Sequence, residues 1–452
     1  MRVSDRLDRL PLGRFHYRVL ILSGLGWMFD SMDVGLVSFA AARLRDEWSL
    51  SSSRIALVLN FSLLGMFLGG ALAGALADRF GRKTIFQVTL LVFSIGTGLC
   101  GLSWGLASLL GLRLVVGLGL GGELPVAASL VSEFAPARHR GRLVVLLESF
   151  WALGSLAAAM ISNLLVPWAE QRGLPFPWRL VFFIGALPAL YVLVLRRVLP
   201  ESPRFLIAKG RRDEAEAVLR CVEAAGGAAP PGRPTEPLES GQETGAPARV
   251  GVRELFGPGL RRRTIMLWIL WFAMGYSYYG IFSWLPTLLV KQGFAIAESF
   301  RFTLYIILAQ IPGYFAAAYL VERIGRRATL VSFMTLCAAA SYFFGTAPTS
   351  GSIVAWGCLV SFFNLGAWGV TYGYTPELYP TRVRATGTGW AAALTRVGGF
   401  LAMLAVGLLL DASGAGLHAV FGMFAGVLAL GAAGVVVLGE ETRGRSLEEI
   451  SG

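Results

Sequence analysis

Long apolar stretches alternate with short polar segments along almost the whole chain. Twelve of these stretches are close to 20 residues long, which is enough for a helix to cross a hydrocarbon core of roughly 30 Å. Their approximate bounds are 20–40, 57–77, 84–104, 106–132, 143–166, 179–198, 264–286, 300–321, 328–346, 352–374, 386–410 and 415–438. The pattern predicts an all-α membrane protein with twelve transmembrane helices in two six-helix bundles, residues 1–198 and 264–452.

The polar segment between the two predicted bundles, residues 199–263, is expected to be a linker with short amphipathic helices. One helix is predicted from Arg211 to Ala225, and a second, basic one from Val252 to Arg263. Between them, residues 226–249 are rich in Gly, Ala and Pro and too poor in large apolar residues to fold alone. The segment therefore predicts a tether between the bundles.

Two charged motifs occur twice with the same spacing of 244 residues. Asp78-Arg79-Phe80-Gly81-Arg82 returns as Glu322-Arg323-Ile324-Gly325-Arg326, while Glu133, Pro136 and Arg140 return as Glu377, Pro380 and Arg384. A single spacing for two separate motifs indicates that the whole intervening stretch was duplicated. Internal repeats of this kind are typical of membrane transporters.

Composition and charge agree with a membrane protein. The chain is 55% hydrophobic and 15% charged, with a formal net charge of +12. Arginines gather before the first apolar stretch and in alternate loops, which predicts by the positive-inside rule that both termini are cytoplasmic. This topology accounts for the positive charge without a nucleic-acid partner. The first 19 residues are polar and basic, and no small-residue cleavage site follows, so the first helix is expected to be retained.

The sequence gives no sign of a cofactor, a metal site or an enzyme. The four cysteines have no paired spacing, and only three histidines are present. Residues 117–122 fit the dinucleotide pattern GxGxxG, but they lie inside an apolar stretch with no strand before them. Such glycines more simply allow two transmembrane helices to approach closely. No Walker A motif is present, which disfavours ATP-driven transport.

Ionisable residues inside the predicted spans are the first candidates for function: Asp30, Asp33, Arg113, Glu123, Glu148 and Arg396. Each costs at least about 2.5–3.5 kcal/mol at mid-membrane, so each should face the bundle interior with a partner or a task. Arg396 is flanked by small residues that leave space for a carboxylate, and we expect it to anchor an anionic substrate. The alternative is a structural partner for Glu123 or for an aspartate of the first span.

The acidic residues of this set are candidates for carrying a proton. Asp30 and Asp33 are three residues apart on one helical face, and two carboxylates so close repel each other when both are charged. Either one could therefore take up a proton, as could Glu123 beside Pro125. The alternative is that the aspartates pair with Arg113 or with polar groups of another helix. Glu148, near the end of the fifth span, is expected to be structural or part of a gate.

Aromatic residues are expected to line the central cavity: Trp151, Tyr278, Tyr279, Trp368 and Tyr372. Flat aromatic walls together with one cation suit a planar ring that carries a carboxylate. Trp368 and Tyr372 are four residues apart on one face of the tenth span and are the preferred pair. Packing against other helices or lipid remains the alternative for each aromatic residue.

The repeated charged motifs resemble the signature of the major facilitator superfamily, and the likeness covers nearly all of the chain except residues 222–250. Pro200-Glu201-Ser202-Pro203-Arg204 and residues 440–444 resemble its sugar-porter and organic-ion branches. In those branches such charges form cytoplasmic salt bridges between helix ends that close the inner gate. The gate residues that the resemblance implies are Asp78, Arg82, Glu133, Arg142, Glu201, Arg204, Glu322, Arg326, Glu377, Arg384 and Glu440.

A narrower resemblance is to the bacterial nicotinate permeases, with the aromatic-acid:proton symporters next. It rests on residues 27–35, 121–126, 147–151, 277–280, 362–369 and 384–389, and it adds Asn364 to the expected substrate contacts. The resemblance implies a monomer in the bacterial inner membrane that imports a small aromatic carboxylate, nicotinate first, by proton symport. The alternatives are an organic cation or sugar permease, and a transporter-like binding or sensing protein without flux.

Overall fold

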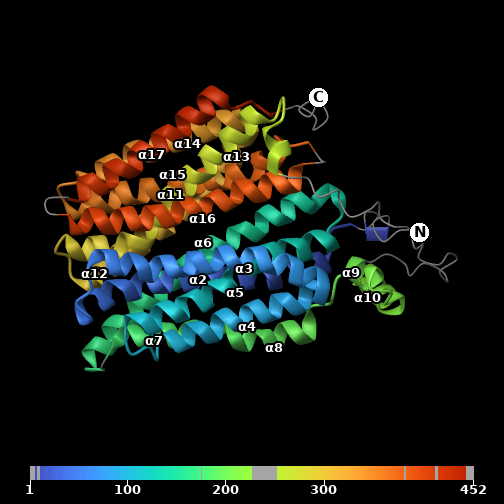
Figure 1. Ribbon diagram of the computed structural model, residues 1–452, viewed down its shortest axis with the longest axis horizontal. Coiled ribbons are helices and arrows are strands. Elements are labelled where there is room, and N and C mark those ends of the chain that lie inside the picture. The colour runs from blue at the N-terminus through green and yellow to red at the C-terminus, as the bar shows by residue number, and fades with distance from the viewer. Residues whose placement is uncertain are drawn as a thin grey trace.

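A computed structural model describes residues 6–7, 11–174, 176–225, 252–380, 383–412 and 416–443, and in this part of the chain the secondary structure is helical. The helices form two groups that lie side by side (Figure 1). The first group, the N-bundle, contains α2 (Arg14–Glu47), α3 (Ser52–Phe80), α4 (Arg82–Cys100), α5 (Leu106–Phe134), α6 (Ala137–Gln171), α7 (Pro177–Gly185) and α8 (Pro188–Val198). The second group, the C-bundle, contains α11 (Arg261–Lys291), α12 (Ile296–Leu308), α13 (Gln310–Ile324), α14 (Arg326–Gly345), α15 (Ser350–Glu377), α16 (Arg384–Asp411) and α17 (Leu417–Leu438).

The twelve predicted spans are confirmed, because twelve helical segments of the described chain are long and apolar enough to cross a membrane. Two of them consist of two helices each instead of one. The sixth span breaks between α7 and α8, where Pro188 cannot continue the helical hydrogen bonding of the preceding turn. The eighth breaks at Ala309 between α12 and α13, three residues before Pro312. Sequence hydropathy alone did not reveal either break.

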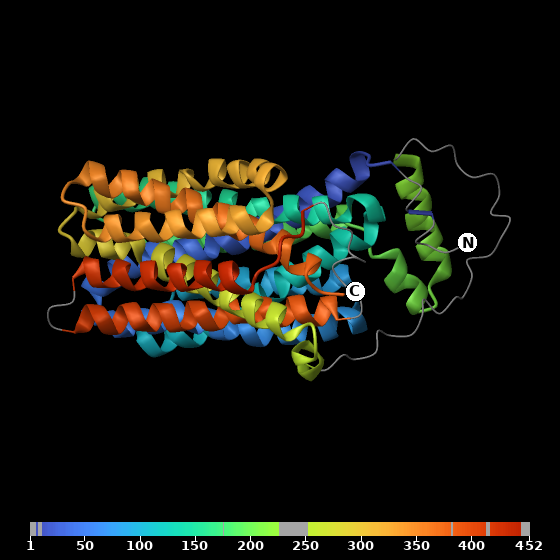
Figure 2. The ribbon, with the colours of Figure 1, turned by 90° about the horizontal axis from the view of Figure 1, so that it is seen from above.

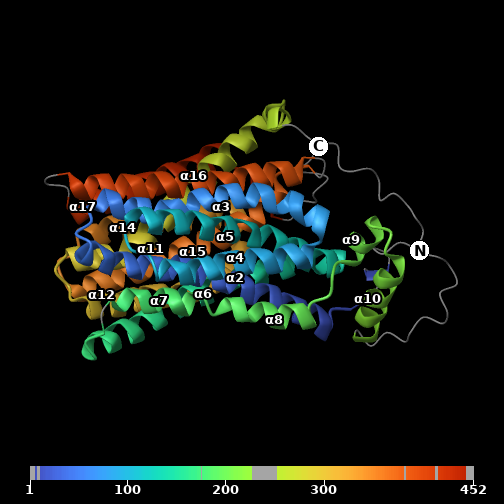
Figure 3. The same cartoon turned by 60° about the horizontal axis from the view of Figure 1, so that its bottom comes forward.

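The two bundles together have two distinct ends. At one end lie α9 (Pro203–Ala208), α10 (Arg212–Ala225) and the 3-10 helix η1 (Val252–Phe256), and we call it the linker end (Figure 2). The opposite end carries short turns between consecutive helices, and we call it the loop end (Figure 3). The helix α10 agrees with the predicted amphipathic helix. The predicted second helix from Val252 to Arg263 was wrong, because η1 stops at Phe256 and α11 begins only at Arg261, after the Gly-Pro-Gly of residues 257–259.

The helix α10 is held against the N-terminal segment. Arg6 Nε donates to Glu223 at 2.8 Å and its Nη1 donates to Glu216 at 2.5 Å, while Leu7 beside it is buried. Partial burial alone would raise the pKa of Glu216, but hydrogen bonds from Arg6 and Arg220 hold that pKa below its ordinary value. Residues 226–249 of the predicted tether lie outside the described residues.

Glycines set the closest helix contacts, as the sequence predicted for residues 117–122. A Cβ on Gly117 of α5 would lie 2.1 Å from the backbone oxygen of Ser62 in α3, so the two helices touch through their backbones. Gly81 and Gly325, which are equivalent in the two repeats, both have positive φ angles of 102° and 92°. They make the sharp turns from α3 to α4 and from α13 to α14, a conformation that favours glycine.

Candidate functional site

The repeated charges at the linker end form equivalent ion pairs in the two bundles. In the N-bundle, Arg82 Nε lies 3.1 Å from Glu133 Oε1, and Glu201 accepts hydrogen bonds from the backbone N–H groups of Arg82 at 3.0 Å and Lys83 at 3.2 Å. These contacts tie α4 to α5 and cap the first turn of α4 with a carboxylate, which the positive end of the helix dipole favours.

In the C-bundle, Arg326 Nη2 lies 3.1 Å from Glu377 Oε1. Glu441 accepts from the backbone N–H groups of Arg326 at 2.9 Å and Arg327 at 3.1 Å, so Glu441 is the counterpart of Glu201. Sequence reasoning named Glu440 instead. The sequence did indicate a glutamate at this position, since Glu201 and Glu441 both follow the last helix of their bundle. Only the geometry shows that Glu441, and not the adjacent Glu440, caps the helix.

The other expected gate residues have varied settings. Glu440 pairs with Arg263 at 3.0 Å, and Arg384 Nε donates to the backbone oxygen of Tyr379 at 3.2 Å. Glu322 is exposed, and neither it nor Arg204 forms an ion pair with another described residue. The side chains of Asp78 and Arg142 lie outside the described part of the structure. The gate pairs that are described each join helices within one bundle.

The hydrogen bonds that join the two bundles, among the described residues, lie at the loop end and at mid-depth. At the loop end, the carboxylate of Asp411 in α16 accepts from the backbone N–H groups of Ser52 and Ser53 at 2.8 Å each, and so caps α3 of the other bundle. At mid-depth, Trp151 Nε1 of α6 donates to Tyr278 Oη of α11 at 2.5 Å. Between pairs of described residues, no hydrogen bond connects the bundles at the linker end.

One of the expected proton carriers has a charged partner. Asp33 pairs with Arg113 through Oδ2 and Nη2 at 2.9 Å, and the hydroxyl of Thr97 also donates to it. Arg113 Nε donates to Ser62 at 2.7 Å, and both members of the pair are almost fully buried. The structure thus joins Asp33 to Arg113, which is the alternative left open by the sequence.

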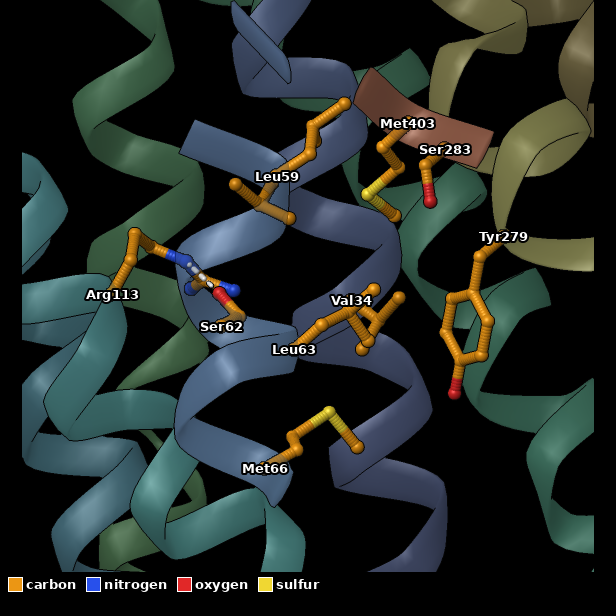
Figure 4. Close-up of a pocket in the computed structure, with 10 residues that line it drawn as sticks. Val34, Leu59, Ser62, Leu63, Met66, Arg113, Tyr279, Ser283 and Met403 are labelled. Carbon is orange, nitrogen blue, oxygen red and sulfur yellow. Dashed lines mark hydrogen bonds between the residues drawn. The ribbon is translucent and has the colours of Figure 1, made fainter. Parts of the chain in front are cut away.

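A small cavity lies between this ion pair and the C-bundle (Figure 4). It has a volume of about 10 Å³, close to the space of one water molecule, and Arg113 and Ser62 lie on one side of it with Tyr279 on another. Met403 and Ser283 of the C-bundle complete its wall beside Tyr279. The pair of Asp33 and Arg113 is therefore close to the interface of the bundles.

Asp30 and Glu123 lack such a partner. Asp30 is fully buried, and neither of its oxygens has a hydrogen-bond donor among the described residues. Glu123 receives one hydrogen bond, from Thr89 at 2.6 Å, and its other oxygen is unpaired. Glu123, Asp33 and Arg396 are all close enough to Asp30 to interact with it electrostatically.

Arg396, the expected anchor, is close to charged and polar groups of both bundles. It is half-buried on α16, and its only hydrogen bond to a described residue is a long one, 3.4 Å, to the oxygen of Ala392 in its own helix. It acts electrostatically on Asp30 and Glu148 of the N-bundle and on Tyr372 of the C-bundle. A half-buried guanidinium that makes one long hydrogen bond to a described residue, close to both bundles, is well suited to take an anion.

The five expected aromatic residues form one cluster next to Arg396. The ring of Tyr278 lies 6.1 Å from that of Trp151, 5.4 Å from Tyr279 and 5.4 Å from Trp368, and Trp368 lies 6.1 Å from Tyr372. Trp151, Tyr278 and Tyr279 are buried, while Trp368 and Tyr372 are half-buried. The structure brings all five together from three helices of both bundles.

Three further residues lie close to this cluster and were not among the expected substrate contacts. Trp27 of α2 lies 4.7 Å from Trp151 and beside Glu148, and Tyr314 of α13 is close to Glu148, Tyr278 and Tyr372. Glu148, expected to be structural or part of a gate, is close enough to Arg396 to interact with it electrostatically. Tyr314 is an uncharged residue of the eighth predicted span, so the sequence gave no reason to place it in the cavity.

Asn364 is buried inside the C-bundle and hydrogen-bonded there. Its Nδ2 donates to Ser277 Oγ of α11 at 2.9 Å, which ties α15 to α11 one residue before Tyr278. Its Oδ1 is buried and has no donor among the described residues. Asn364 is therefore placed to support Tyr278, with one acceptor left unused.

Comparisons with known proteins agree with this architecture. The family described as "Sugar (and other) transporter" matches residues 23–452. The chain is 48% identical over 450 residues to the niacin transporter NiaP of Acinetobacter baylyi, covering 100% of both chains. It is 42% identical over 431 residues to the putative niacin/nicotinamide transporter NiaP of Bacillus subtilis, covering 95% of this chain and 98% of that one. The xylose transporter XylE from E. coli has the same fold, with a TM-score of 0.73 at 18% identity and coverage of 96% and 99%.

Proposed function

Because the chain belongs to the family of sugar and other transporters, and is thus a membrane transporter and not an enzyme, we propose that it imports a small aromatic carboxylate, nicotinate first. The observation that carries this proposal is the position of Arg396 between the bundles, beside the cluster of Trp151, Tyr278, Trp368 and Tyr372. The names of the two bacterial relatives support the same substrate.

In the proposed site, the substrate carboxylate pairs with Arg396 and its ring lies against the half-buried Trp368 and Tyr372. A guanidinium matches a carboxylate with two parallel hydrogen bonds, while aromatic side chains offer flat apolar surface to a planar ring. Glu148 is close enough to Arg396 to interact with it electrostatically, and we propose that it balances the charge of Arg396 in part of the transport cycle.

Proton symport is the second part of the proposal. The interior set has four carboxyl groups, Asp30, Asp33, Glu123 and Glu148, but only two arginines, Arg113 and Arg396. Burying an unpaired charge in the membrane is expensive, so a carboxyl group without a partner gains from binding a proton. Asp30 and Glu123 are the carriers that we favour, because Asp33 is already paired with Arg113.

Transport would proceed by alternating access, with the linker end in the cytoplasm of a bacterial cell. The arginine-rich linker end fits the cytoplasmic side by the positive-inside rule, which places both termini there. The polar contacts across the bundles at the loop end and mid-depth fit a state that is closed to the outside. The equivalent ion pairs of Arg82 and Arg326 fix the helix ends that would meet when the linker end closes.

An organic cation or sugar permease is the competing function, and the excess of buried carboxyl groups over arginines is the observation that favours a cation. Uptake of radiolabelled nicotinate by cells that lack their own transporter separates these functions. We expect competition by benzoate, no competition by choline or glucose, and loss of uptake with a protonophore. Competition by choline instead would favour the cation permease, and specific binding without uptake would indicate a sensor.

A variant of the anchor completes this experiment. Arg396→Ala should abolish nicotinate uptake while membrane insertion, measured by the amount of protein in the membrane fraction, stays normal. Uptake at the wild-type rate by this variant would refute the anchor.

A further inference from the structure

A lateral groove opens on the outer surface of the C-bundle, away from the site. It has a volume of about 340 Å³ and is lined only by apolar atoms of three helices, among them Trp268 and Phe272 of α11, Leu394 of α16, and Leu430 and Gly431 of α17. This volume is within the range of about 300–1,000 Å³ found for ligand pockets. Leu430 is 70% exposed at its rim, so the groove faces the surrounding lipid.

An aromatic layer borders the groove toward the linker end. Trp268 stacks on Trp390 of α16 with ring centroids 6.4 Å apart, and the ring of Phe256 of η1 lies 5.1 Å from that of Trp268 in an edge-on arrangement. Trp390 is 45% exposed and Phe256 is 40% exposed. Exposed tryptophans at the end of a transmembrane helix are typical of the level between the hydrocarbon and the lipid headgroups.

Beyond the aromatic layer are two exposed arginines. Arg261 and Arg262 lie seven residues before Trp268 and Ile269, which puts them on the same face of α11, about 10 Å closer to the linker end. Their neighbour Arg263 pairs with Glu440 at 3.0 Å. Arg261 and Arg262 have no carboxylate partner among the described residues, and Arg262 makes one hydrogen bond, to the backbone oxygen of Val437.

We propose that the lateral groove binds an anionic phospholipid, whose acyl chain lies in the groove and whose headgroup pairs with Arg261 and Arg262. Positive charge, aromatic layer and apolar groove follow one another along α11 in the same order as headgroup, interface and acyl chain follow in a lipid. Basic side chains next to a transmembrane helix attract anionic headgroups by about 1 kcal/mol each, which is about fivefold in affinity.

Two of the three helices that line the groove, α11 and α16, also carry Tyr278, Tyr279 and Arg396. A lipid bound there contacts both helices from outside the bundle and stabilises their packing. The proposal does not depend on which substrate is transported, since it rests on the lateral surface alone.

Native mass spectrometry of the purified full-length protein, mixed with phosphatidylglycerol or phosphatidylcholine, tests this site. We expect the wild type to retain phosphatidylglycerol in preference. The double variant Arg261→Gln/Arg262→Gln should lose that preference by about 25-fold, since each arginine contributes about fivefold. Leu430→Trp, which fills the groove, should reduce retention of phosphatidylglycerol. The matched control is Arg196→Gln/Arg197→Gln, because these arginines are also exposed and at the linker end, but on α8.

Every outcome of this experiment either supports or overturns the lipid site. The proposal is overturned if the wild type retains both lipids equally, if the Arg261/Arg262 variant keeps its preference, or if the control loses as much. Unchanged retention by Leu430→Trp would overturn the placement of the acyl chain. All three variants change exposed side chains, and a single symmetric peak in size-exclusion chromatography confirms that each remains folded.

Discussion

The contact of Asp411 with α3 gives a direct test of how the two bundles are held together at the loop end. Its carboxylate caps the first turn of a helix in the other bundle through two hydrogen bonds of 2.8 Å. Beside it, the helices touch: a Cβ on Gly407 would lie 2.8 Å from Ala56 Cβ and 2.9 Å from the oxygen of Ser52. Asp411→Ala removes the cap but leaves this packing intact.

The size of the effect follows from measured helix caps. Loss of a capping side chain costs about 0.5–2 kcal/mol, and a carboxylate at a helix N-terminus adds about 0.3–1 kcal/mol. Asp411 is exposed to solvent, so we take a value near the low end, about 1 kcal/mol. This free energy stabilises only states in which α3 and α16 touch, so its loss should raise the ratio of open to closed loop ends about fivefold.

Electron–electron double resonance measures this ratio. Nitroxide labels at Arg172 and Gln292, exposed residues at the loop ends of the two bundles, report their separation in a background without the four native cysteines. Asp411→Ala should shift the distance distribution toward longer values. Asp46→Asn is the control, because Asp46 is also an exposed acid at the loop end, on α2. Identical distributions for wild type and Asp411→Ala, or an equal shift in the control, would refute the role of Asp411 in holding the loop ends together.

Three further predictions concern stability. Asp33→Asn leaves the buried Arg113 without a charged partner and should cost about 3–5 kcal/mol, seen as a large loss of folded protein in a fluorescence thermal-stability assay; unchanged stability would contradict the buried pair. Gly117→Ala places a Cβ 2.1 Å from a backbone oxygen of α3 and should lower the melting temperature. The control is Gly111→Ala, whose added Cβ has no atom within 4 Å, so that its melting temperature should stay unchanged or rise. Equal effects of the two substitutions would show that α3 and α5 are not in backbone contact. Glu441→Gln weakens the carboxylate cap on α14 by about 1 kcal/mol, a smaller fall in melting temperature than that of Asp33→Asn, and the reverse order would speak against the assignment of Glu441 as a cap.

Much of the fold was predictable, because the bilayer imposes a length and a composition on each span. The spacing of 244 residues also predicted which charges are equivalent, and the pairs of Arg82 with Glu133 and Arg326 with Glu377 confirm that equivalence. The breaks in the sixth and eighth spans were missed, since hydropathy does not report where a helix is interrupted. A proline marks one break and follows the other closely, but many transmembrane helices contain proline without breaking.

The candidate site was predictable in its residue types and less so in its pairing. A charge at membrane depth must face the interior, which located Asp33, Arg113 and Arg396 from sequence. Whether Asp33 pairs with Arg113 or remains free depends on the register of α2 against α5, which no local pattern records. Tyr314 was missed for a different reason: an uncharged tyrosine in a span is as compatible with lipid as with a cavity.

The central claim is that a carboxylate binds to Arg396, and the measurement that tests it most directly compares two ligands with the same ring. Isothermal titration calorimetry of the purified protein with nicotinate and with nicotinamide isolates the carboxylate. A hydrogen bond to a charged group contributes about 1.5–3 kcal/mol, so the wild type should bind nicotinate at least about tenfold more tightly, and Arg396→Gln should bind the two alike. Equal affinities in the wild type, or a preference for nicotinate that survives Arg396→Gln, would contradict the account.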